Sequence, residues 1–252
     1  MMRYVRLFRN ISNWWLHFAV KFGLTSRDPL LFRTRKRIAV EVPRRLLPEF
    51  KDIFMEECYT RALGLSVPDG PTVIDIGANA GFFSLFAADR FPGANIYSYE
   101  PIDINFRQLI NNMDLNRECN IRCFKYAVYS HSGQLSLYYD TIDSLSTSAT
   151  ILDHQGPQDQ TIQVSCVTLA EIFDENKLDR CDFMKLDCEG SEYEILYKCP
   201  ESYLNRVSQI AAEVHKGREK DHNRDSLEKF LKLKGFSTRK YLTHMLCAWK
   251  TR

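Results

Sequence analysis

The chain has 252 residues, of which 44% are hydrophobic, and a formal net charge of +2, so its length accommodates one domain with extensions and is short for two full domains. No segment approaches the roughly 18 uninterrupted apolar residues of a membrane span, and the basic start lacks a small-residue cleavage site, so we expect a cytoplasmic protein. The eight cysteines contain no CxxC pair, which argues against a zinc ribbon, and we expect reduced, mostly buried thiols.

The first fifty residues are strongly basic. They hold eleven Lys and Arg against three Asp and Glu, and they include Trp14 and Trp15. A segment of this kind can dock on an anionic membrane surface or hold an anionic substrate. The interpretation that we favour is a solvated helix whose aromatic side chains pack on the domain that follows. Peripheral membrane contact remains the alternative.

The patterns before residue 70 predict an extension, and those after it a domain of its own. Ile11–Phe22 and Phe50–Leu65 have apolar residues at helical spacing, and Arg33–Val42 is a basic, β-branched stretch. Pro68–Pro71 is a clear turn. We therefore divide the chain into an N-terminal basic helical extension over residues 1–70 and a main domain over residues 71–252.

From Thr72 onward, short apolar runs alternate with helical patterns, which is typical of an α/β fold with a parallel sheet covered by helices. The predicted strands are Thr72–Ile76, Asn95–Glu100, Ile121–Val128, Gln134–Tyr139 (as a hairpin partner), Thr161–Val167, Asp182–Asp187, Val207–His215, Thr238–Leu242 and Met245–Lys250. The predicted helices are Gly81–Arg90, Ile104–Asn116, Leu169–Phe173 and Leu227–Lys234. Asp140–Gln160 is polar, and we predict a loop there, of the kind that binds ligands or is disordered.

The segment Val73–Phe83 runs from an apolar strand through a glycine-containing turn into a helix. This arrangement exposes backbone N–H groups at the carboxyl end of the sheet, where open α/β proteins bind ligands. Gly77 and Gly81 allow a nucleotide-like ligand to approach closely. The dinucleotide fingerprint would need glycine at 79 and a small residue at 82, but these are Asn79 and Phe82, so a pyrophosphate fits poorly.

The next strand ends at Glu100-Pro101, twenty-five residues after Asp75. A carboxylate there can accept hydrogen bonds from both hydroxyls of a ribose. Adenosine that carries an amino acid meets this description, as in S-adenosylmethionine (SAM). Its carboxylate would use the turn amides, while Asp75 would face its ammonium directly or through water. The alternative, a structural glycine turn beside a surface Glu, explains the order of these elements less well.

A second acidic segment follows the strand Asp182–Asp187. Unpaired carboxylates are costly to bury, so their presence at a strand end indicates a use for negative charge. Ser191 and Glu194 form a predicted capping box, and we therefore interpret Glu192 and Glu194 as structural. Asp187 is expected to point into the cleft, beside the sulfonium and the methyl acceptor.

Glu213 and His215 end a later strand and share a face by alternation. Methyl transfer to a hydroxyl needs a positioned acceptor and removal of its proton. Asp187 and His215 are the candidate bases, with Glu213 beside them as a catalytic residue. A structural histidine is an equally good interpretation of His215. We assign no metal ligands, although a divalent metal that bridges Asp187 and Glu213 is an alternative.

The motifs VIDIGANAGFFS, YSYEP, VTLAEIF and DFMKLDCEGSEYEIL, with AAEVH downstream, resemble the FkbM family of SAM-dependent methyltransferases over about residues 50 to 215. The resemblance implies a class I (Rossmann-like) fold, a mostly parallel seven-stranded sheet with one antiparallel strand and helices on both faces. It also implies SAM as the cofactor and O-methylation, often of sugars or secondary metabolites. Cys188 stands where the family commonly has Val or Ile. The residues that match the family motifs are Asp75, Gly77, Asn79, Gly81, Glu100, Asp187 and Glu189, and Ala78, Pro101 and Ala127 complete the expected cofactor contacts.

The leading hypothesis is therefore transfer of a methyl group to a hydroxyl of a sugar, a glycan or a glycan precursor. A secondary-metabolite hydroxyl, a catalytically silent SAM-binding scaffold and an NAD-dependent sugar dehydrogenase or epimerase are the alternatives. We expect no nucleic-acid substrate, because the fourth strand lacks an Asn/Asp-Pro-Pro-Tyr motif and the main domain is net acidic.

Overall fold

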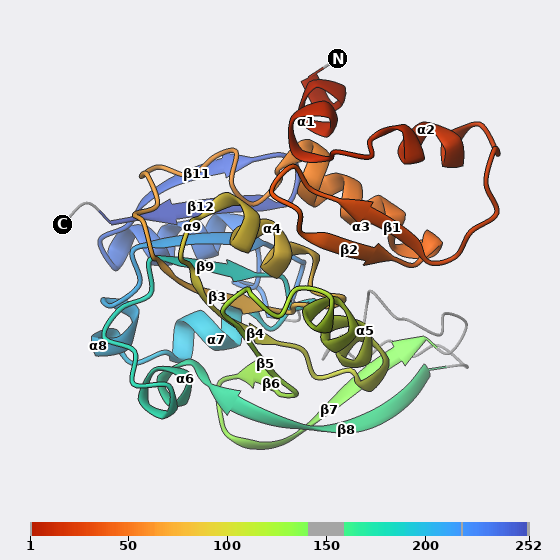
Figure 1. Ribbon diagram of the computed structural model, residues 1–252. Helices are drawn as coiled ribbons and strands as arrows, with labels where there is room; N and C mark the ends of the chain where they lie inside the picture. The colour runs from red at the N-terminus through yellow and green to blue at the C-terminus, as the bar shows by residue number, and fades with distance from the viewer. Residues whose placement is uncertain (1, 141–158, 218, 251–252) are drawn as a thin grey trace.

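The computed structural model describes residues 2–140, 159–217 and 219–250. It contains a seven-stranded sheet, a three-stranded sheet and a small N-terminal hairpin (Figure 1). The loop predicted over Asp140–Gln160 falls outside the described residues except at its ends, which belong to strands. Among the described residues, no helix has the length and apolar character that crossing a bilayer requires.

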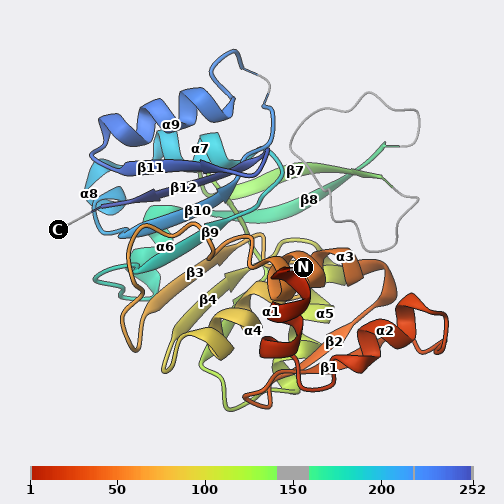
Figure 2. The same cartoon turned by 90° about the horizontal axis from the view of Figure 1, so that it is seen from above.

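The seven-stranded sheet has the order β11-β12-β10-β9-β3-β4-β5. β12 runs opposite to the other six strands of this sheet, so the predicted mostly parallel sheet of the class I methyltransferase fold is confirmed. Figure 2 shows these strands from above, with the C-terminal pair at one edge. The strands are β3 Thr72–Ile76, β4 Asn95–Tyr99, β5 Ile121–Phe124, β9 Phe183–Leu186, β10 Gln209–Glu213, β11 Ser237–Tyr241 and β12 Met245–Trp249.

Alternation along the strands divides the core into two clusters, one on each face of the sheet. Val73 belongs to one cluster, with the N-terminal segment and helix α4, while Ile74 and Ile76 belong to the other. Helices therefore cover both faces, as the sequence predicts. The helices of the first face are α4 Phe82–Arg90 and α5 Asp103–Asp114, and those of the second are α6 Leu169–Glu175, α7 Glu192–Lys198, α8 Glu201–Leu204 and α9 Arg224–Leu233.

The single strand predicted over Ile121–Val128 is wrong, because the chain changes sheets within it. β5 pairs with β4, whereas β6 Ala127–Tyr129 pairs with β8 Asp159–Thr168. β7 Gly133–Asp140 also pairs with β8, antiparallel, rather than with the strand that precedes it. The resulting sheet, in the order β6-β8-β7, places Ala127 at the crossing between the two sheets.

The N-terminal segment forms two helices instead of the single predicted one, and the first begins before the predicted start. α1 spans Met2–Asn10 and α2 spans Trp15–Lys21, while Ile11, the predicted start of a single helix, instead bridges to Thr34. The Ser12 amide donates to the Arg33 carbonyl, and residues 12–14 form a turn between the two helices. Pairing with the hairpin β1 Leu30–Arg33 and β2 Ala39–Val42 thus overrides local helical spacing.

The helix predicted over Phe50–Leu65 is shorter and displaced. Residues Arg44–Leu46, Leu47–Lys51 (α3) and Asp52–Glu56 form successive 3₁₀, α and π turns. Helical structure ends at Glu57, which adopts a left-handed conformation with φ of 54°. Its carboxylate accepts hydrogen bonds from Arg9 and Asn10 of α1, so a distant contact fixes this end.

The N-terminal segment shares the core of the main domain. Leu7, Phe32 and Phe50 belong to the same buried cluster as Val73 and Phe183. Two buried asparagines of the helix region after β4 also tie β2 in place: Asn112 pairs with Glu41, and Asn116 pairs with both backbone groups of Ala39. The division at residue 70 stays a prediction. All eight cysteines are free thiols, four of them buried and four partly buried.

Replacement of Asn112 tests this attachment. Its amide accepts from the Glu41 N–H and donates to the Ala80 carbonyl, so Asn112→Ala leaves buried backbone groups unpaired. Each such group costs about 1 to 3 kcal/mol, and we expect denaturant unfolding to show a loss of at least about 2 kcal/mol. Asn120→Ala, at an exposed side chain, is the control and should change stability by less than about 0.5 kcal/mol. Equal effects of the two substitutions would contradict the attachment.

Candidate active site

The turn after β3 uses its own amides to bind the end of β4. The Gly77 and Ala78 N–H groups both donate to the Tyr99 carbonyl, at 3.0 and 2.9 Å, and the Asn79 N–H donates to Glu100 Oε2 at 2.9 Å. The expectation that these amides are free to hold a cofactor carboxylate is therefore wrong. In the structure, two of them hold the end of β4 and the third, from Asn79, bonds the Glu100 carboxylate.

Gly77 and Gly81 are required by backbone geometry. Both have positive φ, 73° and 82°, and a Cβ on Gly77 would lie 1.7 Å from the carbonyl oxygen of Asp187. A Cβ on Gly81 would lie 2.5 Å from Leu109 of α5. Gly77 therefore allows the turn to contact the end of β9. Gly81 allows the packing of α5 against the turn, and it lines neither of the two cavities that open at the carboxyl ends of β3 and β9.

Asp75 lies behind the turn. Its side chain lines neither of the two cavities at the carboxyl ends of β3 and β9. It is fully buried, accepts a hydrogen bond from the Ser84 hydroxyl at 2.6 Å and lies 3.3 Å from the Lys185 ammonium. Direct contact with a cofactor ammonium, as expected from the sequence, is not what this geometry offers. Ala78 is likewise buried and lines neither cavity.

Lys185 is a functional residue that the sequence reasoning missed. Its ammonium lies 3.3 Å from Asp75 and 3.6 Å from Asp187, and it donates to the carbonyls of Ile76 and Gly77. Burial alone would lower the pKa of Lys185, but these carboxylates outweigh burial and raise it, so the side chain stays charged. A lysine inside the apolar run Phe183–Leu186 was the available signal, because an unpaired buried ammonium would be costly.

Glu100 is fixed by three N–H donors at the base of a narrow slot. Its Oε1 accepts from the Ile102 amide at 2.9 Å and from Asn105 at 3.5 Å, in addition to the Asn79 contact of Oε2. Burial raises the pKa of Glu100 to about 7, and the two backbone amides partly offset that effect. Three of the four acceptor positions are thus occupied, so one ribose hydroxyl can bond Oε2 directly, and a second at Oε1 would replace the long Asn105 contact.

Two adjoining cavities meet at the carboxyl ends of β3 and β9. The slot has a volume of about 70 Å³, and its lining includes Gly77, Glu100, Pro101, Ala127 and Asp187. The second cavity, which we call the chamber, has a volume of about 550 Å³. Asn79, Asp187 and Glu189 line both. The slot is smaller than an adenosyl group, so a nucleoside held at Glu100 must widen it, whereas the chamber is large enough for a sugar-sized acceptor.

Tyr59, which the sequence reasoning also missed, connects the two carboxylates at the chamber floor. Its hydroxyl lies 2.7 Å from Asp187 Oδ2 and 3.2 Å from Glu213 Oε2. Burial raises the pKa of Tyr59, and the charge of Asp187 raises it further, so the phenol stays protonated and donates. No local motif surrounds Tyr59, and its position follows from packing of the N-terminal segment against the sheet.

The chamber wall is acidic. Glu49, Asp52, Glu56, Asp187, Glu189 and Glu213 face it, together with Arg45 and His244. Burial raises the pKa of Glu49 to about 8, and the charge of Asp187 contributes to that rise. The nearby Lys185 ammonium lowers the pKa of Glu49, but it does not outweigh burial and the neighbouring carboxylates.

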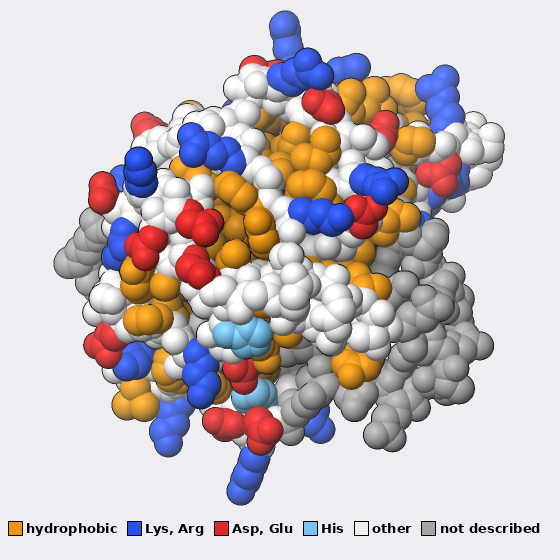
Figure 3. Space-filling view, turned by 90° about the horizontal axis from the view of Figure 1, so that it is seen from below, with side chains coloured by type: hydrophobic (Ala, Val, Ile, Leu, Met, Phe, Trp, Pro, Cys, Tyr) orange, Lys and Arg blue, Asp and Glu red, His pale blue; other side chains and the backbone are white. Residues whose placement is uncertain are grey.

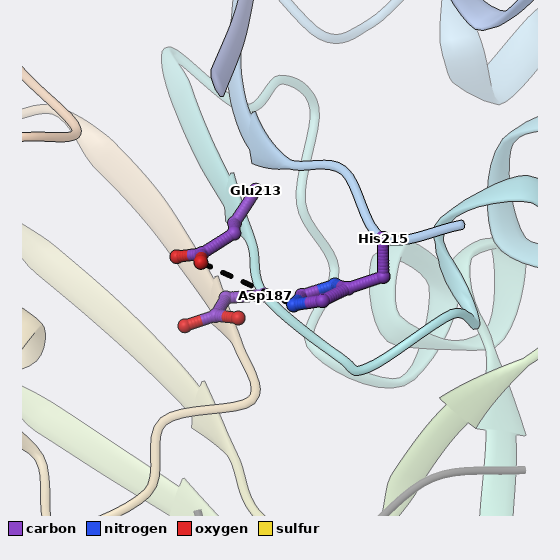
Figure 4. Close-up of side chains that lie close together, drawn as sticks. All are labelled: Asp187, Glu213 and His215. Atoms are coloured by element: carbon purple, nitrogen blue, oxygen red, sulfur yellow. Dashed lines mark ion pairs between the residues drawn. The ribbon is translucent and has the colours of Figure 1, made fainter. Parts of the chain in front are cut away.

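His215 lies beside this pair of carboxylates, and its ring is directed toward Asp187 and Glu213 (Figure 4). Its Nδ1 lies 2.9 Å from Glu192 Oε1, and its Nε2 lies 3.5 Å from Glu189 and 4.0 Å from Glu213. Burial alone would lower the pKa of His215, but the hydrogen bond to Glu192 and the charges of Glu192 and Glu189 raise it to about 9. A ring that is already protonated cannot accept a proton, so this geometry does not favour His215 as the base.

The capping box predicted at Ser191 is absent. Ser191 is the N-cap of α7, but its side chain makes no capping hydrogen bond. Glu192, interpreted from the sequence as a structural helix start, is fully buried and bonds His215 and the Cys188 amide instead. Glu192 therefore orients the His215 ring.

Asp187, Glu213 and His215 could together hold a metal ion, because one ligand atom from each lies within 4.8 Å of the others.

Comparison with known proteins agrees with this geometry. Residues 75–238 match the family model described as the methyltransferase FkbM domain. Methyltransferase sdnD of Sordaria araneosa is 26% identical over 216 residues, 74% of this chain and 80% of sdnD. The 31-O-demethyl-FK506 methyltransferase FkbM of Streptomyces tacrolimicus is 26% identical over 66% of this chain and 73% of its own length. The hexuronic acid methyltransferase AglP of Haloferax volcanii is 23% identical over 66% of this chain and 65% of its own.

A solved structure supports the fold. The methyltransferase FkbM from Methylobacillus flagellatus KT superimposes with a TM-score of 0.52 at 15% identity, over 81% of this chain. This chain spans 54% of that protein, so the likeness concerns a shared domain.

The pKa of Glu100 gives a testable pH dependence for cofactor binding. Ribose hydroxyls donate to the ionised carboxylate, and the free protein is half protonated there near pH 7. Below pH 7, the dissociation constant for S-adenosylhomocysteine should therefore rise toward about tenfold per pH unit, and above it should level off. In calorimetry, Glu100→Gln should lose this dependence and bind more weakly by about 1 to 3 kcal/mol. Identical pH profiles for the two proteins would remove Glu100 from the cofactor site.

Proposed function

The chain belongs to the FkbM family of methyltransferases, and from that premise we propose that it is a SAM-dependent O-methyltransferase acting on a hydroxyl of a sugar or glycan precursor. One observation carries the proposal: Asp187 lines both the slot that holds Glu100 and the wide chamber beside it. A methyl donor in the first and an acceptor in the second would therefore meet at Asp187.

Residues of the slot would bind the cofactor, and residues of the chamber would bind the acceptor. Glu100, held by the turn amides, would accept hydrogen bonds from the ribose hydroxyls, and Pro101 and Ala127 would contact the nucleoside along the slot. SAM supplies an activated methyl group on a sulfonium. The chamber would hold the acceptor, and the fixed relation between the ends of β3 and β9 would align it for an in-line displacement.

Asp187 is the base that this arrangement favours. Its Oδ2 accepts from Tyr59 and faces the Lys185 ammonium, which fixes the carboxylate at the junction of the cavities. Protonated His215 would contribute a positive charge beside it rather than accept a proton. The acceptor hydroxyl would donate its proton to Asp187 as its oxygen bonds to the methyl carbon.

The chamber supports an uncharged or cationic acceptor over an anionic one. Six carboxyl side chains line it against one arginine and one histidine. Even with Glu49 largely protonated near pH 7, because burial raises its pKa to about 8, the remaining acids would repel a uronic acid or a phosphate. The named substrates of AglP and FkbM show that relatives act on a hexuronic acid and on demethylated FK506. For this chain we propose a neutral sugar hydroxyl, with a secondary-metabolite hydroxyl as the second candidate.

A silent SAM-binding scaffold is the competing function from another class. It predicts cofactor binding without methyl transfer to any acceptor. Intact Glu100 and Asp187 at adjoining cavities weigh against it, because a scaffold has no need for an acidic chamber beside the cofactor slot.

Calorimetry and methyl transfer from labelled SAM test the proposal together. SAM and S-adenosylhomocysteine should bind and NAD should not, and a panel of neutral mono- and oligosaccharides should include an acceptor. Asp187→Asn should lower its turnover by about 10² to 10⁴-fold with little change in cofactor affinity, since general base catalysis contributes that much. Asp179→Asn, at an exposed position, is the matched control. Tight NAD binding, or full turnover by Asp187→Asn, would contradict the proposal.

A further inference from the structure

We propose that Asp187, Glu213 and His215 bind one divalent cation at the junction of the slot and the chamber, and that the cation holds the acceptor hydroxyl. The acceptor part of this inference rests on the proposed function, whereas metal binding itself does not. The three side chains come from the ends of neighbouring parallel strands, so the sheet brings them together (Figure 4).

The geometry of the ligand atoms fits a single ion. All three lie within 4.8 Å of one another, and an ion about 2.0 to 2.4 Å from each ligand spans pairs up to nearly that separation. Tyr59 contacts Asp187 through Oδ2 and Glu213 through Oε2, so the other oxygen of each carboxylate is not engaged by Tyr59. Glu213 Oε1 lies 3.5 Å from His244 Nε2 and 4.0 Å from His215 Nε2. The Lys185 ammonium, at 3.6 Å, faces Asp187 Oδ2 as well.

Glu192 provides an independent observation. Metal-ligating histidines commonly donate their other ring nitrogen to a carboxylate, which fixes the tautomer and the ring orientation. Glu192 is fully buried and lies 2.9 Å from His215 Nδ1, so Nε2 is directed to the carboxylate pair. A buried carboxylate that only started a helix would have no reason to hold this ring.

The ligand set favours a particular class of ion. Two carboxylates and one imidazole suit Mn²⁺, Fe²⁺ or Zn²⁺ better than Mg²⁺ or Ca²⁺, which prefer oxygen alone. A cation here would bind the acceptor oxygen and lower the pKa of its hydroxyl. With the cation bound, Asp187 and an Nε2-deprotonated His215 would serve as ligands rather than as base and cation. The hydroxyl proton would leave to water, the oxygen would bond to the methyl carbon, and the carbon–sulfur bond would break with its electron pair staying on sulfur.

Titration of the chelator-treated full-length protein with Mn²⁺, followed by the electron paramagnetic resonance signal of free Mn²⁺, tests the site without cofactor or acceptor. One ion should bind per chain. Glu213→Gln and His215→Gln should each weaken binding at least tenfold, and Glu192→Gln should weaken it about 10 to 100-fold through the ring orientation. His131→Gln, an exposed histidine in the three-stranded sheet region, is the matched control and should leave binding unchanged.

The same samples separate this inference from the proposed function. Absence of Mn²⁺ binding, or equal binding by His215→Gln and the unaltered protein, overturns the metal site even where SAM binds normally. Absence of SAM binding to a protein that holds Mn²⁺ contradicts the proposed function instead. Thermal melting checks folding, and if buried Glu192→Gln fails to fold, the less buried His215→Gln decides the question.

A second inference rests on the surface of α1 and α2: we infer that this surface docks on an anionic lipid membrane. The rings of Phe8, Trp14, Phe18 and Phe22 form a continuous series with centroids 4.9 to 6.4 Å apart. Phe8, Trp14 and Phe22 are exposed by 40%, 37% and 66%, and Trp15 by 56%. Among the aromatic side chains, Tyr4 and Phe18 pack against the core whereas Trp14 and Trp15 are exposed, so the favoured expectation of aromatic packing holds for only part of this segment.

The basic side chains around this surface favour an anionic lipid membrane as its binding partner. The exposed basic residues of positions 2–37 are Arg3, Arg9, Lys21, Arg27, Arg33, Arg35, Lys36 and Arg37, whereas Asp28 is the exposed acid of the same described stretch. By contrast, the face seen from below in Figure 3, away from α1, shows Lys and Arg side chains interspersed with Asp and Glu. Exposed aromatic rings beside clustered basic groups suit a lipid headgroup layer, because rings enter the interface and cations meet anionic lipids.

Sedimentation with vesicles tests this surface. The protein should bind vesicles of phosphatidylcholine with about 30% phosphatidylserine, less so at high salt, and bind pure phosphatidylcholine weakly. Trp15→Ser combined with Phe22→Ser should weaken binding about tenfold. Leu233→Ser, which alters an equally exposed side chain on α9, is the control. Equal binding to both vesicles, equal losses in both variants, or binding to an RNA oligonucleotide instead of vesicles would overturn the inference.

Discussion

One buried ammonium group organises the end of the sheet where the site lies. Lys185 on β9 stands opposite Asp75 on β3 in the strand register, and it also reaches Asp187 and the carbonyls of the turn. A buried carboxylate is costly without such a partner, and the lysine compensates two of them. The turn so fixed binds Glu100 through Asn79, while Asp187 directly follows the end of β9 at Leu186. The Lys185 ammonium therefore stabilises both the cofactor site and the acceptor site.

The sequence predicts the parts of the structure that depend on local pattern. Alternating apolar runs identify the strands of the main sheet, and the strand-turn-helix segment with Glu100 identifies the slot, because the ends of parallel strands meet at one edge. Asp187 and Glu213 follow from the same reasoning, and they face one chamber. Six of the residues expected to bind cofactor line the slot: Gly77, Asn79, Glu100, Pro101, Ala127 and Asp187.

Contacts between distant segments could not be predicted in this way. Tyr59 reaches Asp187 across 128 positions of the chain, and no local period records that approach. The turn amides looked available because their acceptor, the Tyr99 carbonyl, lies on another strand. The strand predicted through residue 128 divides because its second part pairs with β8. Asp75 matches the family motif, but its carboxylate pairs with the Lys185 ammonium. Only the register between β3 and β9 places these two residues opposite each other.

The central claim is that Glu100 and Asp187 mark the two ends of a bound adenosyl group. A crystal structure of the protein with S-adenosylhomocysteine measures this most directly. The account predicts both ribose hydroxyls within hydrogen-bond distance of the Glu100 carboxylate, with the sulfur beside Asp187 and facing the chamber. A nucleoside bound elsewhere, or a ribose that turns away from Glu100, would contradict it.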